Sequence, residues 1–110
     1  MLLAFSVAPS GIPADAAYAK EDADGSVHDA VAAAVRIVRD SGLPNKTDSM
    51  FTTIEGEWDE VFAVVKRATE EVGKYGSRVS LVIKADIRPG FSGELTAKVE
   101  RLEDALGDRS

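Results

Sequence analysis

The chain has 110 residues and a mass of 11.7 kDa, a size that fits one domain around a single hydrophobic core. Hydrophobic residues make up 45%, too many for a disordered chain, and no apolar run reaches the roughly 20 residues of a membrane span. The net charge of −6 argues against nucleic acid as a partner, because phosphate binding needs basic patches. Cysteine is absent, which excludes disulfides and cysteine-ligated metals and suits a reducing compartment. With no basic residue before the apolar start at residues 1–5, we expect no secretory signal and a cytoplasmic location.

The first part of the chain predicts a strand, a loop and a helix. Residues 2–8 alternate, which predicts a strand with Leu3, Phe5 and Val7 on one face. Residues 14–25 are acidic and alanine-rich without a consistent period, and we interpret them as a surface-loop insertion with at most one helical turn. Apolar residues at helical spacing then predict a first helix that begins at Ser26 and ends at Gly42.

The second part predicts two further helices and two or three strands. Residues 46–56 predict one strand, or two short strands with a bend near Ser49. Residues 57–75 predict a second helix, and its apolar stripe comprises Trp58, Val61, Phe62, Val65, Ala68 and Val72. Residues 77–87 alternate as the clearest strand, and a third helix from Ser92 carries Leu95, Val99, Leu102 and Leu106.

This order of elements predicts an α+β protein, a ferredoxin-like two-layer sandwich over residues 1–110. Its antiparallel sheet has helices on one face, and an extra helix follows at the C-terminus. The phase of the strands predicts a helix-facing set of Leu3, Phe5, Val7, Met50, Ile54, Val79, Leu81 and Ile83. It predicts an open face with Ala4, Ser6, Ala8, Phe51, Thr53, Glu55, Ser80, Val82 and Lys84. A face so rich in small and apolar side chains is expected to meet another subunit or a ligand.

Four short segments resemble, in order and spacing, a known family. They are SVAP at residues 6–9, SGL at 41–43, MFTTIEGEW at 50–58 and IKADIR at 83–88. The third is similar to the M-G-T-x-x-E-G segment of the small thiamine-binding protein family, and the fourth to its I-K-x-D-x-R strand end. The resemblance implies a ferredoxin-like homodimer or homotetramer that binds thiamine or its pyrimidine moiety as a ligand, with no cofactor and no established reaction. Phe51 stands where the family has glycine, and residues 14–25 lie outside the resemblance.

Five polar residues are candidates for ligand contact. The carboxylate of Glu55 can hydrogen-bond a ring nitrogen of an aminopyrimidine, although an acid there also suits the start of the second helix. Lys84 lies on the same predicted face, as a ligand contact, a partner for Glu55 or a charge at the sheet edge. Ser6 and Thr53 can orient a ligand through their hydroxyl groups. Thr52 matches the threonine of the family, but its strand phase points it toward the helices.

Two aromatic residues are candidates for stacking on a flat or cationic ring. Phe51 is predicted on the open face, whereas Trp58 has the spacing of a core residue or of a second stacking group. His28 is the only histidine, so no set of nucleophile, base and orienting group can be assembled. Residues 22–25, Asp-Ala-Asp-Gly, resemble part of a calcium loop but lack the remaining ligands, so we expect no metal site.

The resemblance, taken together with these residues, implies a homo-oligomeric, non-catalytic protein that binds thiamine or a related aminopyrimidine. Two alternatives stay open. One is a small dimeric ferredoxin-like enzyme in which Glu55 acts as a general base beside Lys84. The other is a regulatory or scaffolding module that has no small ligand and no cavity beside Glu55.

Overall fold

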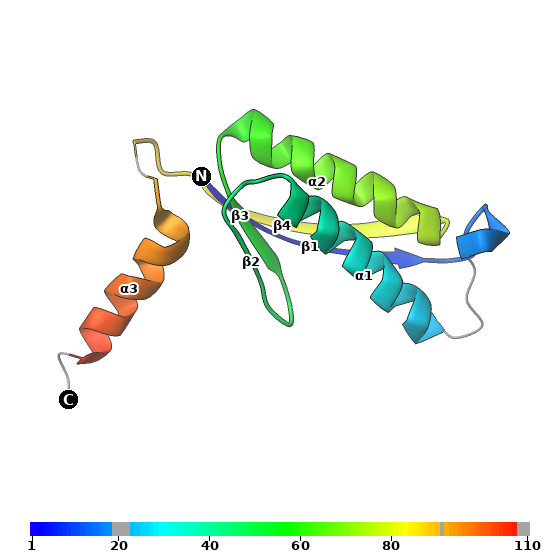
Figure 1. The fold of residues 1–110 in the computed structure, drawn as a ribbon, viewed down its shortest axis with the longest axis horizontal. Coiled ribbons are helices and arrows are strands. Elements are labelled where there is room, and N and C mark those ends of the chain that lie inside the picture. The colour runs from blue at the N-terminus through cyan, green and yellow to red at the C-terminus, as the bar shows by residue number, and fades with distance from the viewer. Residues whose placement is uncertain (19–22, 91, 108–110) are drawn as a thin grey trace.

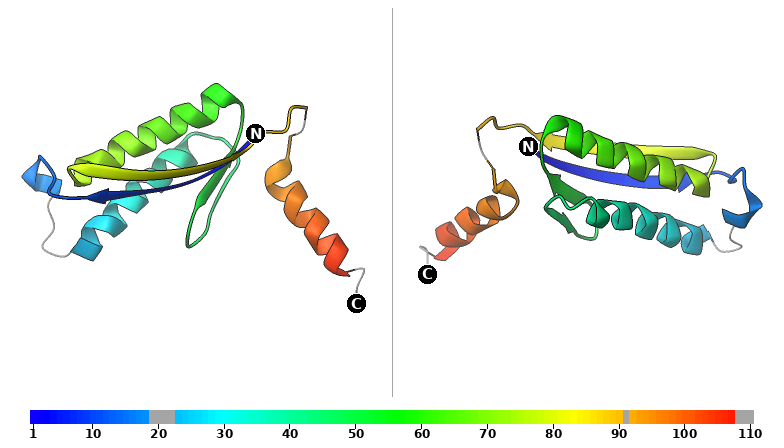
Figure 2. Two further views of the ribbon diagram at one scale, coloured as in Figure 1. Left: turned by 180° about the vertical axis from the view of Figure 1, so that it is seen from behind. Right: turned by 45° about the horizontal axis from the view of Figure 1, so that its top comes forward.

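The computed structural model describes residues 1–18, 23–90 and 92–107 and confirms the ferredoxin-like order (Figure 1). Its elements are β1 (Leu2–Ser10), a 3-10 turn η1 (Ala16–Tyr18), α1 (Ala23–Asp40), β2 (Asn45–Thr47), β3 (Thr52–Glu55), α2 (Trp58–Val72), a 3-10 turn η2 (Gly73–Tyr75), β4 (Arg78–Asp86) and α3 (Glu94–Gly107). The strands form one sheet in the order β2-β3-β1-β4, and every neighbouring pair is antiparallel. Figure 2 shows α1 and α2 together on one face of this sheet, while α3 stands apart from both.

Helix boundaries follow local chemistry, with one correction. Gly42, with φ of +79°, turns the chain after α1, and Ser41 supports that turn by donating its hydroxyl hydrogen to the carbonyl of Val38. Before α2, Glu57 and Glu60 form a reciprocal capping box. The start expected at Ser26 is wrong, because α1 begins at Ala23. The first residues of α1 therefore come from the segment assigned to the loop 14–25, where alanine favours helix and aspartate suits a helix N-terminus.

A tight turn separates β2 from β3, as the bend expected near Ser49 requires. The Asp48 carboxylate accepts hydrogen bonds from the backbone N–H groups of Met50 and Phe51, at 2.8 and 2.9 Å. The bonds from Phe51 and Met50 lower the pKa of Asp48 below its ordinary 3.8. Because these two residues belong to the turn and not to a strand, Met50 is 71% exposed instead of facing the helices.

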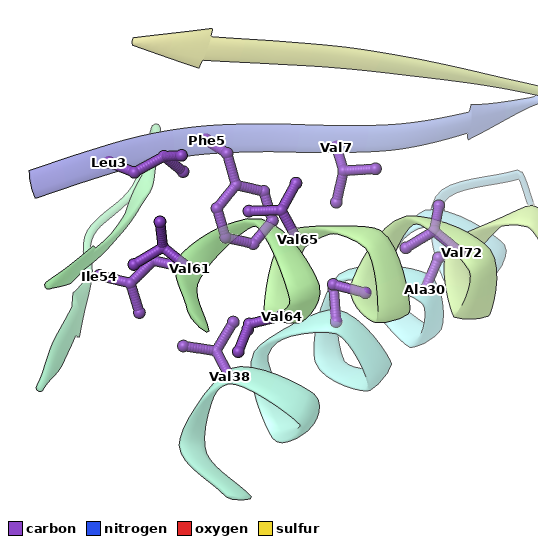
Figure 3. Packing of buried hydrophobic residues seen from close by; sticks show 12 residues of the cluster. Leu3, Phe5, Val7, Ala30, Val38, Ile54, Val61, Val64, Val65 and Val72 are labelled. Atoms are coloured by element: carbon purple, nitrogen blue, oxygen red, sulfur yellow. The ribbon is translucent and has the colours of Figure 1, made fainter. Parts of the chain in front are cut away.

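The core lies between the sheet and the two covering helices (Figure 3). Leu3, Phe5 and Val7 of β1 point into it, as their alternation predicts. Apolar side chains from β3, α1 and α2 complete it, namely Ile54, Ala30, Ala34, Val38, Val61, Val64, Val65, Ala68 and Val72. None of the residues in this cluster comes from α3.

The edge strand β4 is less covered than its pattern predicts. Leu81 and Ile83 pair with Val7 and Phe5 and so share the helix-facing side, yet they are 39% and 38% exposed. The reason is that β4 has a neighbouring strand on one side only. The helices bury the central strand β1 more completely than this edge.

Candidate functional site

The open face of the sheet carries the predicted polar residues in rows across the strands. The strand β1 lies between β3 and β4, so its outward-pointing residues have neighbours on one or both of those strands. The register groups Glu55 with Leu2 and Asp86, Thr53 with Ala4 and Lys84, and Ser6 with Val82. Four of the predicted ligand-contact residues, Ser6, Thr53, Glu55 and Lys84, therefore share one face of three adjacent strands.

Glu55 is the buried member of this group. Only 9% of it is exposed, and its Oε2 accepts a hydrogen bond of 2.8 Å from the backbone N–H of Glu94, the first residue of α3. The sequence predicted Glu55 either as a ligand contact or as an acid at the start of α2, and neither prediction included this bond. Because Glu57 caps α2, Glu55 lies outside that helix and caps α3 instead. A carboxylate has about four acceptor sites, so Glu55 keeps capacity to accept hydrogen bonds from a ligand.

One ion pair joins the start of α3 to the sheet near Glu55, and a second lies within α3 itself. Arg101 donates to the carboxylate of Glu94 at 2.8 Å, and the Glu94 side chain is itself buried. Lys98 forms an ion pair with Asp86 at the end of β4. The Lys98–Asp86 ion pair and the bond from Glu94 to Glu55 hold the first two turns of α3 against the end of the sheet where β3 and β4 terminate.

Lys84 is exposed and lies on β4, on the other side of β1 from Glu55. Two strand spacings of about 4.8 Å separate the strands that carry them. Within the described residues Lys84 has no ion pair, so the expected pairing with Glu55 is absent. Ser6 and Thr53 are half-buried on the same face, and Thr53 lies one row and Ser6 two rows from Glu55 along the strands.

The residues at positions 51 and 52 lie away from this face. Thr52 is 7% exposed, pairs with Phe5 on the helix-facing side, and forms a hydroxyl–hydroxyl hydrogen bond of 3.0 Å with Thr47. Its predicted strand phase is confirmed, which makes it a packing residue. Phe51 was expected on the open face but lies in the turn, where it lines a cavity of about 160 Å³ together with Phe5 and Val31.

Trp58 is not a core residue, although its helical spacing suggested one. It is the first residue of α2, is 53% exposed, and stacks on Phe62 with ring centroids 5.2 Å apart. It lines a cavity of about 200 Å³ with Met1, Ile87 and Arg88. The two aromatic candidates thus line separate cavities in one protomer.

A larger cavity of about 310 Å³ lies between β2 and α3. It is lined by Asn45, Lys46, Leu95, Thr96, Val99 and Glu100, so aliphatic and charged side chains share its wall. Its volume is at the lower end of the range for small-molecule sites. Sequence reasoning missed these residues as a site, because the pattern of residues 92–107 indicates only an amphipathic helix. The cavity depends on where that helix sits beside the sheet.

Other classes of site have little support in the described part of the chain. No group of three or more His, Cys, Asp or Glu side chains in residues 1–18, 23–90 and 92–107 is placed to hold a metal ion. Asp22, in the calcium-loop-like segment, lies outside the described residues. His28 is exposed on α1. Within the same ranges, no helix has the length and apolar content needed to cross a membrane.

The fold and the sequence both match known proteins. A protein of Bacillus cereus with a domain of unknown function has a similar structure, with a TM-score of 0.67 and 30% identity over 86% of this chain and 83% of that one. A Thermotoga maritima protein provisionally assigned to thiamine biosynthesis or salvage has a TM-score of 0.68 and 20% identity, covering 90% of this chain and 96% of that one. At that identity the likeness concerns the fold alone.

Sequence comparison extends over nearly the whole chain. A UPF0045 protein of Mycobacterium bovis is 50% identical over 107 residues, which cover 96% of this chain and 94% of the relative. The model of the thiamine-binding protein family matches residues 4–103, a span that contains most of β1, both core helices, the open-face residues and most of α3. The chain therefore belongs to the thiamine-binding protein family.

Proposed function

We propose that this protein binds thiamine, or a related aminopyrimidine, on the open face of its sheet as a cytoplasmic homo-oligomer. The observation that carries the proposal is the buried carboxylate of Glu55, which shares this face with the hydroxyl group of Thr53. Family membership supports the class of ligand. The net charge of −6 suits a cationic ligand such as one with a thiazolium ring.

The chemistry of the aminopyrimidine fits an acceptor of this kind. A carboxylate forms strong, charge-assisted hydrogen bonds, and Glu55 makes one with the N–H of Glu94. Burial next to Leu2 excludes water and would strengthen a second such bond to a ligand amine. Ser6 and Thr53 would orient the ring through their hydroxyl groups.

The cavity beside α3 is where the remainder of the ligand would extend. Leu95 and Val99 give it an aliphatic wall, and Glu100 contributes a carboxylate that would attract a cationic ring. Phe51 and Trp58 line other cavities, so stacking by these two residues is not part of the proposal. Aliphatic contacts would replace stacking in this protomer.

Assembly is the second part of the proposal. Ala4, Ala8 and Val82 lie on the open face, and Val82 is 53% exposed. Apolar surface of this kind favours association. Val82→Asp should convert the oligomer to monomers in sedimentation analysis, because the contact would bury an unpaired charge. Ala63→Asp, at an exposed position of α2, should leave the assembly unchanged. A Val82→Asp protein that sediments like the wild type would refute this interface.

Calorimetry with thiamine tests the ligand. The wild type should give a saturable heat of binding, and Glu55→Gln should weaken the affinity at least tenfold, because the amide lacks the negative charge. Glu70→Gln is the matched control, since the Glu70 side chain is 65% exposed on α2. Absence of both heat and thermal stabilisation at millimolar thiamine would overturn the proposal, as would equal affinities for the wild type and Glu55→Gln.

A further inference from the structure

The strand β1 has one edge that its neighbour covers only in part. On that side β3 pairs with residues 2–5 of β1, and the pairing ends where Phe5 meets Thr52. On the other side β4 pairs with all nine residues of β1. Beyond Phe5, no strand within the described residues runs along the β3 side of β1. The second half of this central strand therefore has one open edge.

The direction of the backbone bonds shows which polar groups the open edge presents. Met1 and Gly56 exchange two hydrogen bonds, of 2.8 and 3.1 Å, at the start of the β1–β3 ladder. Such pairs recur at every second residue, so the odd-numbered residues of β1 direct their backbone groups toward β3. Val7 and Pro9 are the odd-numbered residues beyond the end of β3, and proline has no N–H. The edge therefore presents the N–H and C=O of Val7 and the C=O of Pro9.

A cavity lies beside these backbone groups. It has a volume of about 160 Å³ and is lined by residues of β1, α1 and the β2–β3 turn, among them Val7, Val31, Val35 and Phe51. Figure 1 shows β2 and β3 diverging from β1 toward their turn, which opens this space. Val7 is only 8% exposed, and no described residue lies opposite it in the β1–β3 ladder. Because buried backbone groups are nearly always paired, the cavity indicates a place for a partner.

The helix α1 gives the open edge an apolar floor. Val27, Val31 and Val35 follow at spacings of four residues and so lie along one side of α1. Val27 and Val31 are 37% and 40% exposed. A wider hollow of about 520 Å³ continues over α1 and shares Val31 and Val35 with the first cavity. The two hollows thus form one apolar surface beside β1.

The border of this surface is basic, although the chain is acidic. Arg36, Arg39 and His28 line the wider hollow, and all three are exposed. Asp40 is the one carboxylate among the described residues that line it, and no ion pair between described residues joins it to either arginine. Two guanidinium groups against one carboxylate, in a chain with a net charge of −6, favour an anionic partner at this border.

We propose that the open edge of β1 binds an extended acidic segment of another protein, which adds to the sheet as an antiparallel strand. A residue opposite Val7 would exchange two backbone bonds with it and direct its side chain to the same face, into the cavity. The residue opposite Pro9 would donate a third bond and lie on the same face. The segment therefore has apolar side chains at alternate positions and acidic side chains near Arg36 and Arg39. A small amphiphilic acid would leave the C=O groups of Val7 and Pro9 unpaired.

Fluorescence anisotropy with labelled peptides tests this recognition. The peptide EELTVEVE has apolar residues at alternate positions and an acidic charge, and KKLTVKVK is its charge-reversed control. We expect saturable binding of EELTVEVE and an affinity at least about tenfold lower for KKLTVKVK. A third peptide is EELTVEVE methylated on the backbone nitrogens of its leucine and two valines. It cannot donate to Val7 or Pro9, and its affinity should also be at least about tenfold lower.

Charge-reversal variants of the protein provide a matched control. Arg36→Glu combined with Arg39→Glu should weaken the binding of EELTVEVE at least about tenfold and strengthen that of KKLTVKVK. Lys66→Glu combined with Arg67→Glu makes the same change in net charge at exposed positions of α2. This second pair should leave the affinity for EELTVEVE nearly unchanged, because α2 does not line either hollow.

Amide hydrogen exchange locates the contact. EELTVEVE should slow exchange of the Val7 amide at least about tenfold, whereas the Ala8 amide, which faces β4, should change little. Unchanged exchange at Val7, no saturable binding at millimolar peptide, or equal affinities for the three peptides would overturn the proposal. So would equal effects of the two double variants. Protection of Val7 that rises with protein concentration alone would overturn it as well, because a second copy would then occupy the edge. No measurement here contains thiamine, so a failure is distinct from a failure to bind thiamine in calorimetry.

Discussion

Replacement of Glu55 by alanine should release α3 from the sheet and leave the core folded. The carboxylate of Glu55 receives the N–H of Glu94 at 2.8 Å in a buried setting. A hydrogen bond to a charged group stabilises by about 1.5–3 kcal/mol, and loss of a helix cap costs about 1 kcal/mol in many proteins. We therefore expect the free energy of local opening of α3 to fall by about 2 kcal/mol, which is about a 30-fold increase in the open population.

Amide hydrogen exchange resolves this local effect from global unfolding. Exchange at the α3 amides should accelerate about 30-fold in Glu55→Ala, while the amides of α2, whose residues Val61, Val65 and Val72 are core, should change little. Glu55→Gln should give a smaller acceleration, because the amide oxygen still accepts a hydrogen bond but carries no charge. Glu70→Ala serves as the control, with an expected change below about 0.5 kcal/mol at its exposed site. Unchanged exchange in α3, or equal acceleration in α2 and α3, would refute the capping role of Glu55.

Three further predictions concern the scaffold. Because the pKa of Asp48 is lowered in the folded protein, its carboxylate stabilises the β2–β3 turn fully at pH values above the ordinary pKa of 3.8. This stabilisation is lost as the pH falls through the lower pKa of the folded state. An NMR titration of Asp48 should give a pKa below 3.8, and an ordinary pKa would contradict the turn geometry. Ile54→Ala should lower the free energy of unfolding by about 2–5 kcal/mol in denaturant titrations, whereas Ile12→Ala, at an 83% exposed site, should change it by less than about 0.5 kcal/mol; similar losses would contradict the core assignment. Tyr18→Ala removes an edge-to-face contact with Tyr75, at a centroid distance of 5.0 Å, and should cost about 0.5–1.5 kcal/mol in the same assay; no measurable loss would show that this turn does not support the fold.

Several features of the protein followed from local patterns. Alternation in residues 2–8 predicted the inward side chains of Leu3, Phe5 and Val7, because successive strand residues point to opposite faces. The same rule placed Thr53 and Glu55 on the open face and Thr52 on the other. The order of strands and helices predicted the ferredoxin-like sheet, since short connections and antiparallel pairing leave few alternative topologies.

Other features depended on the path of the chain in space. The exposure of Ile83 follows from how far the helices cover the edge strand, and periodicity carries no information about that coverage. The position of Phe51 follows from the bonds of Asp48 to the turn, which remove it from the strand that its neighbours form.

Glu55 has one property that the sequence determines and one that only the tertiary structure determines. Strand phase alone determined the face on which its side chain lies. Its hydrogen bond to Glu94 joins residues that are 39 positions apart. Periodicity and capping are set by neighbouring residues, whereas a contact between distant segments exists only once the intervening strand and helix have packed.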